Sequence, residues 1–144
     1  MNKSVLYILL LTVFPFFLSG CKKKVRPTTM VIKDSVRHYY PIKQGQQLDI
    51  MFTITNTGDA PLVISDIQPS CGCIILDKSS HIIIPEEGIR QFKATYNSIK
   101  NIGEVVHRIR IFGNMLPNGK AELTFDVNVV PDADYTRDYE ELFQ

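Results

Sequence analysis

The chain has 144 residues, and the part that follows its N-terminal 20 residues suits one domain. Its 16 lysines and arginines nearly balance its 15 aspartates and glutamates, so the formal net charge at pH 7 is +1. A balanced charge gives no electrostatic reason to expect nucleic acid or an acidic substrate. We therefore expect no nucleic-acid partner.

The first 20 residues have the pattern of a secretory signal peptide. Lys3 supplies a positive start, residues 5–18 form an apolar run, and Leu-Ser-Gly precedes Cys21. The run has 14 residues, whereas a membrane-spanning helix needs about 20, and Pro15 disfavours a long helix. The cut site resembles that of a bacterial lipoprotein, whose cysteine is lipidated and becomes the first mature residue. We predict a lipoprotein signal peptide over residues 1–20 and lipidation of Cys21.

Lipidation would tether the mature protein to a membrane surface without spanning the membrane. Residues 21–29 then form the lipidated cysteine and a basic linker, which is either simply solvated or in contact with anionic headgroups. Residues 131–144 carry five carboxylates against Arg137 and are expected to form an acidic, soluble tail. The predicted location is the cell envelope, facing the periplasm of a Gram-negative bacterium.

From residue 30 to residue 130, apolar side chains alternate with polar ones at a period of two, as in half-buried strands. In the clearest case we expect Leu48, Ile50, Phe52 and Ile54 to face the core and Asp49, Met51 and Thr53 to face solvent. The same alternation is present over residues 91–96, 108–111 and 122–129, and shorter strand candidates are residues 31–39, 61–67, 73–76 and 81–84.

Turn signals separate these strands, among them residues 56–59, 85–88 and 117–119. Asn118-Gly119 is a strong signal for a tight turn, because both residues tolerate positive φ. After the signal peptide no stretch combines helix caps with an apolar stripe. The sequence therefore predicts an all-β fold, a single immunoglobulin-like antiparallel β-sandwich of about seven strands over residues 30–130.

Several motifs follow one another in order along this region. They are Phe-Thr-Ile-Thr-Asn-Thr-Gly at 52–58, Ala-Pro-Leu-Val-Ile at 60–64, Ser-Cys-Gly-Cys at 70–73, Ile84-Pro85, Gly88, Tyr96, Gly103 and the strand 109–111 that ends near Asn114. This order resembles the bacterial family called domain of unknown function 1573, which implies an immunoglobulin-like sandwich in an envelope lipoprotein. Two residues separate Pro85 from Gly88, whereas the family usually has glycine directly after proline, and Ile74 stands where the family usually has threonine. The resemblance implies no activity.

Cys71 and Cys73 are the thiols that remain once Cys21 is assigned to lipid, and three interpretations are open. In the first, they are structural residues that form at most an occasional disulfide. In an extended strand, the Cα atoms of residues two apart lie at the upper edge of the distances that a disulfide can bridge, although a turn at Gly72 could bring them closer. In the second, the two cysteines act in thiol exchange or redox chemistry. In the third, the two cysteines bind a soft ion such as Cu(I), and one further ligand is offered by His81, His107, Met51 or Met115.

Two cysteines alone do not make a zinc site, which needs four ligands, and we assign no metal site from the sequence. His107 falls on the apolar side of its strand, where a histidine is more often a hydrogen-bonded core or rim residue than a ligand. We also expect the aromatic residues to serve core and rim packing; they are Tyr39, Tyr40, Phe92, Tyr96 and Phe125.

The sequence contains no nucleophile elbow, phosphate loop or paired His–Glu metal motif. We therefore expect no catalytic residues, no enzyme and no cofactor. The predicted function is that of a lipid-anchored, non-catalytic binding or structural module of the cell envelope, with a protein partner of unknown identity. The alternative is a thiol redox or copper-handling protein that uses Cys71 and Cys73.

Overall fold

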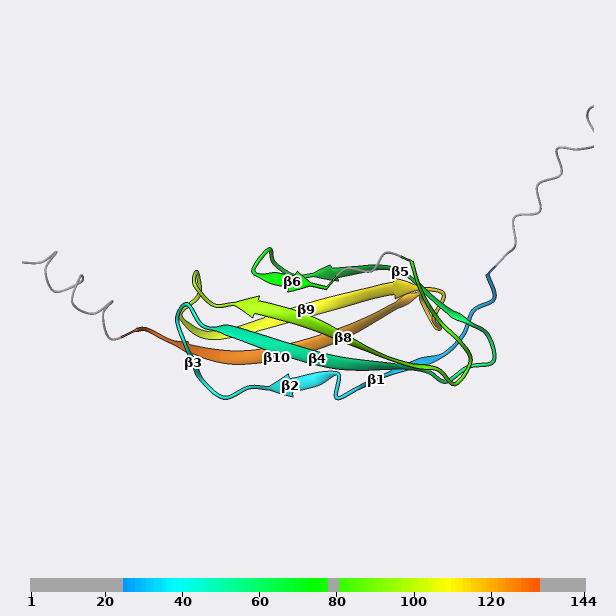
Figure 1. Ribbon diagram of the computed structural model, residues 1–144, viewed down its shortest axis with the longest axis horizontal. Coiled ribbons are helices and arrows are strands. Elements are labelled where there is room, and N and C mark those ends of the chain that lie inside the picture. The colour runs from blue at the N-terminus through cyan, green and yellow to red at the C-terminus, as the bar shows by residue number, and fades with distance from the viewer. Residues whose placement is uncertain (1–24, 78–80, 133–144) are drawn as a thin grey trace, which may run out of the picture.

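The computed structural model describes residues 25–77 and 81–132. The predicted signal peptide, the lipidation site Cys21 and most of the predicted acidic tail lie outside the described residues. The described part consists of ten strands in two packed sheets, which confirms the all-β sandwich (Figure 1). Within it there is no helix of the length and hydropathy that a membrane crossing requires.

The two sheets contain four and six strands. The first has the order β1 (Met30–Lys33), β4 (Gln47–Asn56), β8 (Ile89–Asn97) and β6 (Ile74–Leu76). The second has the order β2 (Val36–His38), β10 (Lys120–Val130), β9 (Gly103–Gly113), β5 (Leu62–Pro69) and β7 (Ile82–Ile84), with β3 (Ile42–Lys43) also paired to β10. All neighbouring strands are antiparallel except β2 and β3, which run parallel to β10.

The prediction of one strand over residues 31–39 is wrong, because this stretch forms two strands in different sheets. Asp34 has φ 55°, in the left-handed region, and it separates β1 from β2. The chain therefore leaves β4 and joins β10, where Arg37 pairs with Phe125. The split strand and the short β3 raise the number of strands above the predicted seven, and their parallel pairing makes this edge of the sandwich mixed.

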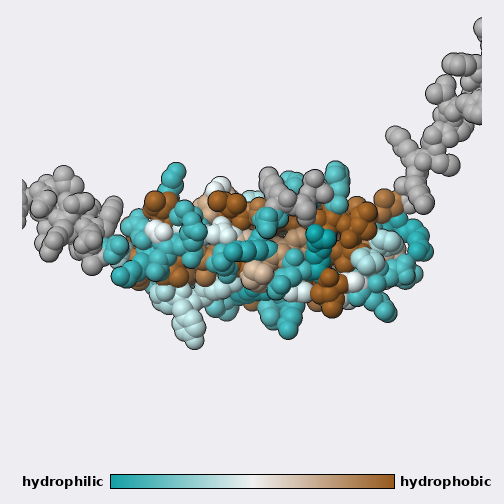
Figure 2. All heavy atoms as spheres, in the orientation of Figure 1, coloured by the Kyte–Doolittle hydropathy of each residue, from teal (hydrophilic) through white to brown (hydrophobic). Residues whose placement is uncertain are grey.

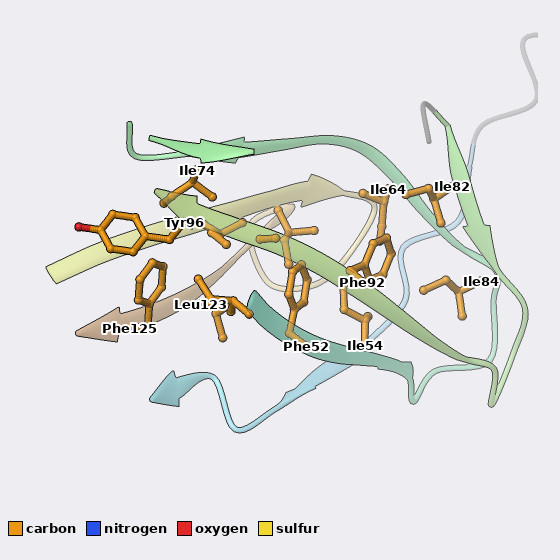
Figure 3. Packing of buried hydrophobic residues seen from close by; sticks show 14 of the residues in the cluster. Phe52, Ile54, Ile64, Ile74, Ile82, Ile84, Phe92, Tyr96, Leu123 and Phe125 are labelled. Atoms are coloured by element: carbon orange, nitrogen blue, oxygen red, sulfur yellow. The ribbon is translucent and has the colours of Figure 1, made fainter. Parts of the chain in front are cut away.

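The predicted inward and outward faces of β4 are confirmed. Ile50, Phe52 and Ile54 are fully buried and Asp49 and Met51 are exposed, whereas Leu48 and Thr53 are both half-buried. On the face that Figure 2 shows, hydrophilic side chains alternate with apolar ones. The inward side chains of β4, β8, β9 and β10 interdigitate between the sheets, as Figure 3 shows for Phe52, Phe92, Tyr96, Leu123 and Phe125.

Asn56, the last residue of β4, explains why an Asn-Thr-Gly motif follows this strand. It is fully buried, and its amide nitrogen donates to the carbonyl oxygens of Ala60, Ile84 and Pro85 at 2.8–3.1 Å. Its amide oxygen accepts from the Thr28 hydroxyl at 2.9 Å. One side chain thus joins two turns and the N-terminal segment at the same end of the sandwich.

The N-terminal segment and the β8–β9 loop lie at opposite ends of the sandwich. Thr28 pairs with Met115 at the end where β9 finishes, next to the first described residues. At the opposite end, Gly103 pairs with Val129, so the β8–β9 loop lies beside the end of β10. The N-terminal and C-terminal described residues therefore lie at opposite ends of the molecule (Figure 1).

Candidate functional site at the Cys71–Cys73 disulfide

Cys71 and Cys73 form a disulfide bond in the loop between β5 and β6. Their Cα atoms are 5.2 Å apart, inside the range of roughly 4.4–6.8 Å that disulfides adopt. A turn at Gly72 gives this separation, as the sequence allowed. The turn does not demand glycine, because the φ of Gly72 is not positive and no described atom lies within 4 Å of the position that a Cβ would take.

Hydrogen bonds on both sides fix the loop to the two sheets. The Ser70 amide donates to the Arg108 carbonyl at 2.8 Å, and the Arg108 amide donates to the Ser70 hydroxyl at 3.1 Å. On the other side, the Asn97 amide donates to the Cys73 carbonyl at 2.8 Å. The disulfide is therefore held between β9 of one sheet and β8 of the other.

His107, on β9, lies against both sulfur atoms. Its Nδ1 is 3.8 Å from the Cys71 Sγ, and its Nε2 is 4.0 Å from the Cys73 Sγ. The Ser70 hydroxyl lies 3.4 Å from Nδ1. The side chain is buried, as its place in the alternation predicted, and it contacts the disulfide at the rim of the core.

Two aromatic rings form the inner wall behind His107. Their centroids lie 4.8 Å (Tyr96) and 5.5 Å (Phe125) from the imidazole centroid. The Tyr96 hydroxyl is buried and finds no hydrogen-bond partner among the described atoms. Burial lowers the pKa of His107 below its ordinary 6.5 and raises the pKa of Tyr96 above 10.0. The imidazole is therefore neutral at pH 7.

An open depression of about 540 Å³ gives solvent access to the disulfide. Both cysteines line it, together with Ile75, Ile99 and Lys100. Ile75 is 66% exposed and Ile99 is 60% exposed, so the rim of the depression is apolar. Figure 2 shows hydrophobic side chains at the surface near β6 in the orientation of Figure 1.

The other ligands that the sequence suggested lie away from the disulfide. His81 lines a separate depression beside β7, and Met51 is exposed on β4. Met115 is buried at the far end of the sandwich, next to Thr28. Of the four suggested helpers, the structure thus brings only His107 to the thiols.

Comparisons with known proteins bear on the family and the fold. A family model described as "Protein of unknown function (DUF1573)" matches residues 30–129, and no curated protein matches the chain. The PapD-like domain 7 of human CEP192 is similar, with a TM-score of 0.59 and 11% identity over 80% of this chain and 94% of that one. A Porphyromonas gingivalis W83 protein of unknown function has a TM-score of 0.60 and 11% identity over 77% and 51%.

The chaperone DraB of E. coli is also similar, with a TM-score of 0.53 and 11% identity over 72% of this chain and 57% of that one. At such low identity the likeness shows the fold alone. It agrees with the predicted immunoglobulin-like sandwich and says nothing of ligand or partner.

Proposed function

This chain belongs to the DUF1573 family of proteins of unknown function, and from that premise we propose that it is a lipid-anchored, non-catalytic module of the cell envelope that binds a protein partner. The residue pattern up to Cys21 supports the anchor. The observation that carries the binding role is the depression beside the disulfide, with its two exposed isoleucines.

The placement of the depression suits a tethered module. The first described residue, Val25, follows Cys21 by four positions in the sequence and precedes Thr28, which pairs with Met115 at one end of the sandwich. The depression includes Ile99 and Lys100 of the β8–β9 loop, which belongs to the other end. A lipid on Cys21 would therefore leave this surface at the end away from the attachment point.

The edge of β6 defines the kind of partner that fits. Among the described strands β6 is the last of its sheet, so one of its edges faces away from β8. An extended segment can add to such an edge through main-chain hydrogen bonds, with side chains in neighbouring pockets providing specificity. Because Ile75 and Ile99 are large and exposed, the partner segment carries apolar side chains toward the depression.

A photoactivatable cross-linking residue tests this surface in cells that express the full chain. At position 75 it should give one discrete adduct, which a second change, Ile99→Glu, should remove. The matched control is position 89, because Ile89 is 70% exposed but lies at the opposite end of β8. Equal adducts at positions 75 and 89, or none at 75, would contradict the proposal.

A second candidate function is thiol–disulfide exchange, and the accessible disulfide beside His107 favours it. A bridge that closes three residues stabilises the fold by only about 1.6 kcal/mol in the chain-entropy estimate, so little stability is lost on reduction. If exchange is the function, the Cys71→Ser/Cys73→Ser variant should fold and keep the adduct at position 75. Cells that express it should differ from wild-type cells only under oxidant stress. Wild-type behaviour under that stress would exclude this candidate.

A further inference from the structure

Three metal-ligating side chains meet at the disulfide although they come from distant parts of the chain. One ligand atom from each of Cys71, Cys73 and His107 lies within 4.8 Å of the other two. The two sulfurs line the open depression, and the imidazole closes the group from the core side. This arrangement offers two soft ligands and one imidazole on a single side of an apolar pocket.

We propose that reduction of the Cys71–Cys73 bond creates a binding site for one Cu(I) ion, held by the two thiolates and the imidazole of His107. The disulfide is then the closed, metal-free form of the site. This inference goes beyond partner binding, since a protein can dock on Ile75 and Ile99 whether or not the sulfurs hold a metal.

The sulfur–nitrogen distances fit a shared ion. A metal with bonds of about 2.3 Å to sulfur and about 2.0 Å to nitrogen places these atoms about 3.5–3.7 Å apart at tetrahedral to trigonal angles. The His107 Nε2 is 4.0 Å from the Cys73 Sγ, and one ligand atom from each of the three residues lies within 4.8 Å of the other two, so a movement of about 1 Å would bring them onto one ion. The sulfurs separate when their bond breaks, and the exposed turn at Gly72 leaves room for that change.

Neighbouring groups orient the imidazole for such a role. A metal-binding histidine usually donates its second ring N–H to another group, which fixes the tautomer. Here the Ser70 hydroxyl lies 3.4 Å from Nδ1 and is itself held by the Arg108 amide. With Nδ1–H directed at Ser70, the lone pair of Nε2 is available on the side of Cys73.

The ligand set favours Cu(I) over Zn²⁺. Thiolates are soft ligands that select Cu(I), whereas zinc sites are almost always four-coordinate. In the described residues the group contains no fourth histidine, cysteine or carboxylate, so zinc would have to complete its shell with water. Two thiolates and one Cu(I) leave a net charge of −1, and Lys100 supplies a positive charge in the same depression.

The reaction that opens the site needs a dithiol as reductant. A thiolate of the dithiol attacks one sulfur of the bridge, the Cys71–Cys73 bond breaks, and the second thiol resolves the mixed disulfide. The dithiol is oxidised to a disulfide by two electrons, and its two protons pass to Cys71 and Cys73. Binding of Cu(I) then releases these two protons, and the copper keeps its oxidation state.

Anaerobic titration of the purified mature domain with Cu(I), in competition with a chromophoric Cu(I) chelator, tests the proposal. The reduced wild type should bind one Cu(I), and the disulfide form should bind at least 100-fold more weakly. His107→Gln should lower the affinity at least tenfold while the fold is retained, and His81→Asn, a control at the separate depression, should leave it unchanged. X-ray absorption of the complex should show two sulfur ligands and one nitrogen.

Three results would overturn the Cu(I) site: equal affinity in the reduced and disulfide forms, equal affinity in wild type and His107→Gln, or tighter binding of Zn²⁺ than of Cu(I) at matched chelator competition. Comparing the two redox forms needs no substitution, so a misfolded cysteine variant does not affect the test. The cross-linking experiment at position 75 uses no copper and does not depend on the sulfurs, so the partner-binding proposal stands or fails separately.

Discussion

Asn56 shows how much a single buried polar side chain contributes to this fold. Asn56→Ala removes a fully buried donor for the carbonyls of Ala60, Ile84 and Pro85, of which the Pro85 carbonyl still accepts from the Gly88 amide. We expect the free energy of unfolding to fall by about 2–4 kcal/mol, measured by urea denaturation. Thr57→Ala, at an exposed neighbour, should change it by less than about 0.5 kcal/mol, and similar losses for both variants would contradict this role.

The buried imidazole of His107 should make stability depend on pH. Burial lowers its pKa in the folded chain, while the unfolded chain takes up the proton near 6.5. The contribution of His107 to the free energy of unfolding is therefore fully present above pH 6.5. It falls as the pH drops from 6.5 toward the pKa of His107 in the folded chain, by at most about 1.4 kcal/mol per pH unit. Of the groups packed against the ring, Tyr96 titrates far above this window and the bridged cysteines do not titrate.

The measurement is the free energy of unfolding of the disulfide form between pH 4.5 and 7.5, compared with His107→Gln. The difference between the two proteins should shrink as the pH falls below 6.5, because the variant has no imidazole to protonate. A difference that is constant across this range would mean that His107 has an ordinary pKa in the folded chain.

The sequence predicted part of the candidate site. The alternation in β9 correctly placed His107 on the apolar side, and it was one of four suggested partners for the thiols. Its position against both sulfurs could not be predicted, because 34 residues separate Cys73 from His107 and the path of the loop depends on the pairing of β5 with β9. That register shifts between Ile64 and Asp66, and no local pattern encodes the shift.

Among the strands, β4 gives the sharpest test of the register. Phe52 is fully buried and stacks on Phe92 with ring centroids 5.3 Å apart, whereas Thr53 is only half-buried. Phe52→Ala should therefore cost about 3–5 kcal/mol in the free energy of unfolding, and Thr53→Ala far less. Thermal or urea unfolding of both variants provides the comparison, and equal losses would show that the inward face is misassigned.

Replacement of two glycines by alanine should have very different effects on the free energy of unfolding. Gly72→Ala should keep the disulfide and change the unfolding free energy by less than about 1 kcal/mol, because space is open and φ is not positive. Gly113→Ala should be strongly destabilising, because a Cβ there would collide with the Val63 carbonyl. For both variants, mass spectrometry reports whether the disulfide is present, and urea unfolding measures the stability. Loss of the disulfide in Gly72→Ala would show that the turn needs glycine.

The long strands and the short edge strands β6 and β7 lie where the sequence predicted strands, whereas the break between β1 and β2 and the strand β3 could not be predicted. Alternation over many residues identifies β4 and β10, because one face of each meets the core, whereas the alternation found in β9 covered only residues 108–111. The switch between β1 and β2 occurs at a single residue, Asp34, and such a residue leaves no periodic signal. The parallel pairing of β2 and β3 is set by tertiary packing against β10.

At the scale of the whole molecule, the proposed attachment point and the proposed binding surface belong to opposite ends of the described domain. The chain enters at the end near Thr28, after the proposed anchor and its basic linker. The disulfide, His107 and the exposed isoleucines lie toward the β8–β9 loop. In the proposed arrangement, the sandwich is a rigid spacer that presents a redox-active, apolar surface on a tethered protein.

The most direct test of this account is the intact mass of the protein isolated from the cell envelope and alkylated with and without prior reduction. We predict the mass of residues 21–144 plus acyl chains on Cys21, with no alkyl adduct before reduction and two after it, one each on Cys71 and Cys73. An unacylated N-terminus, a third adduct at Cys21, or two adducts without reductant would contradict the account.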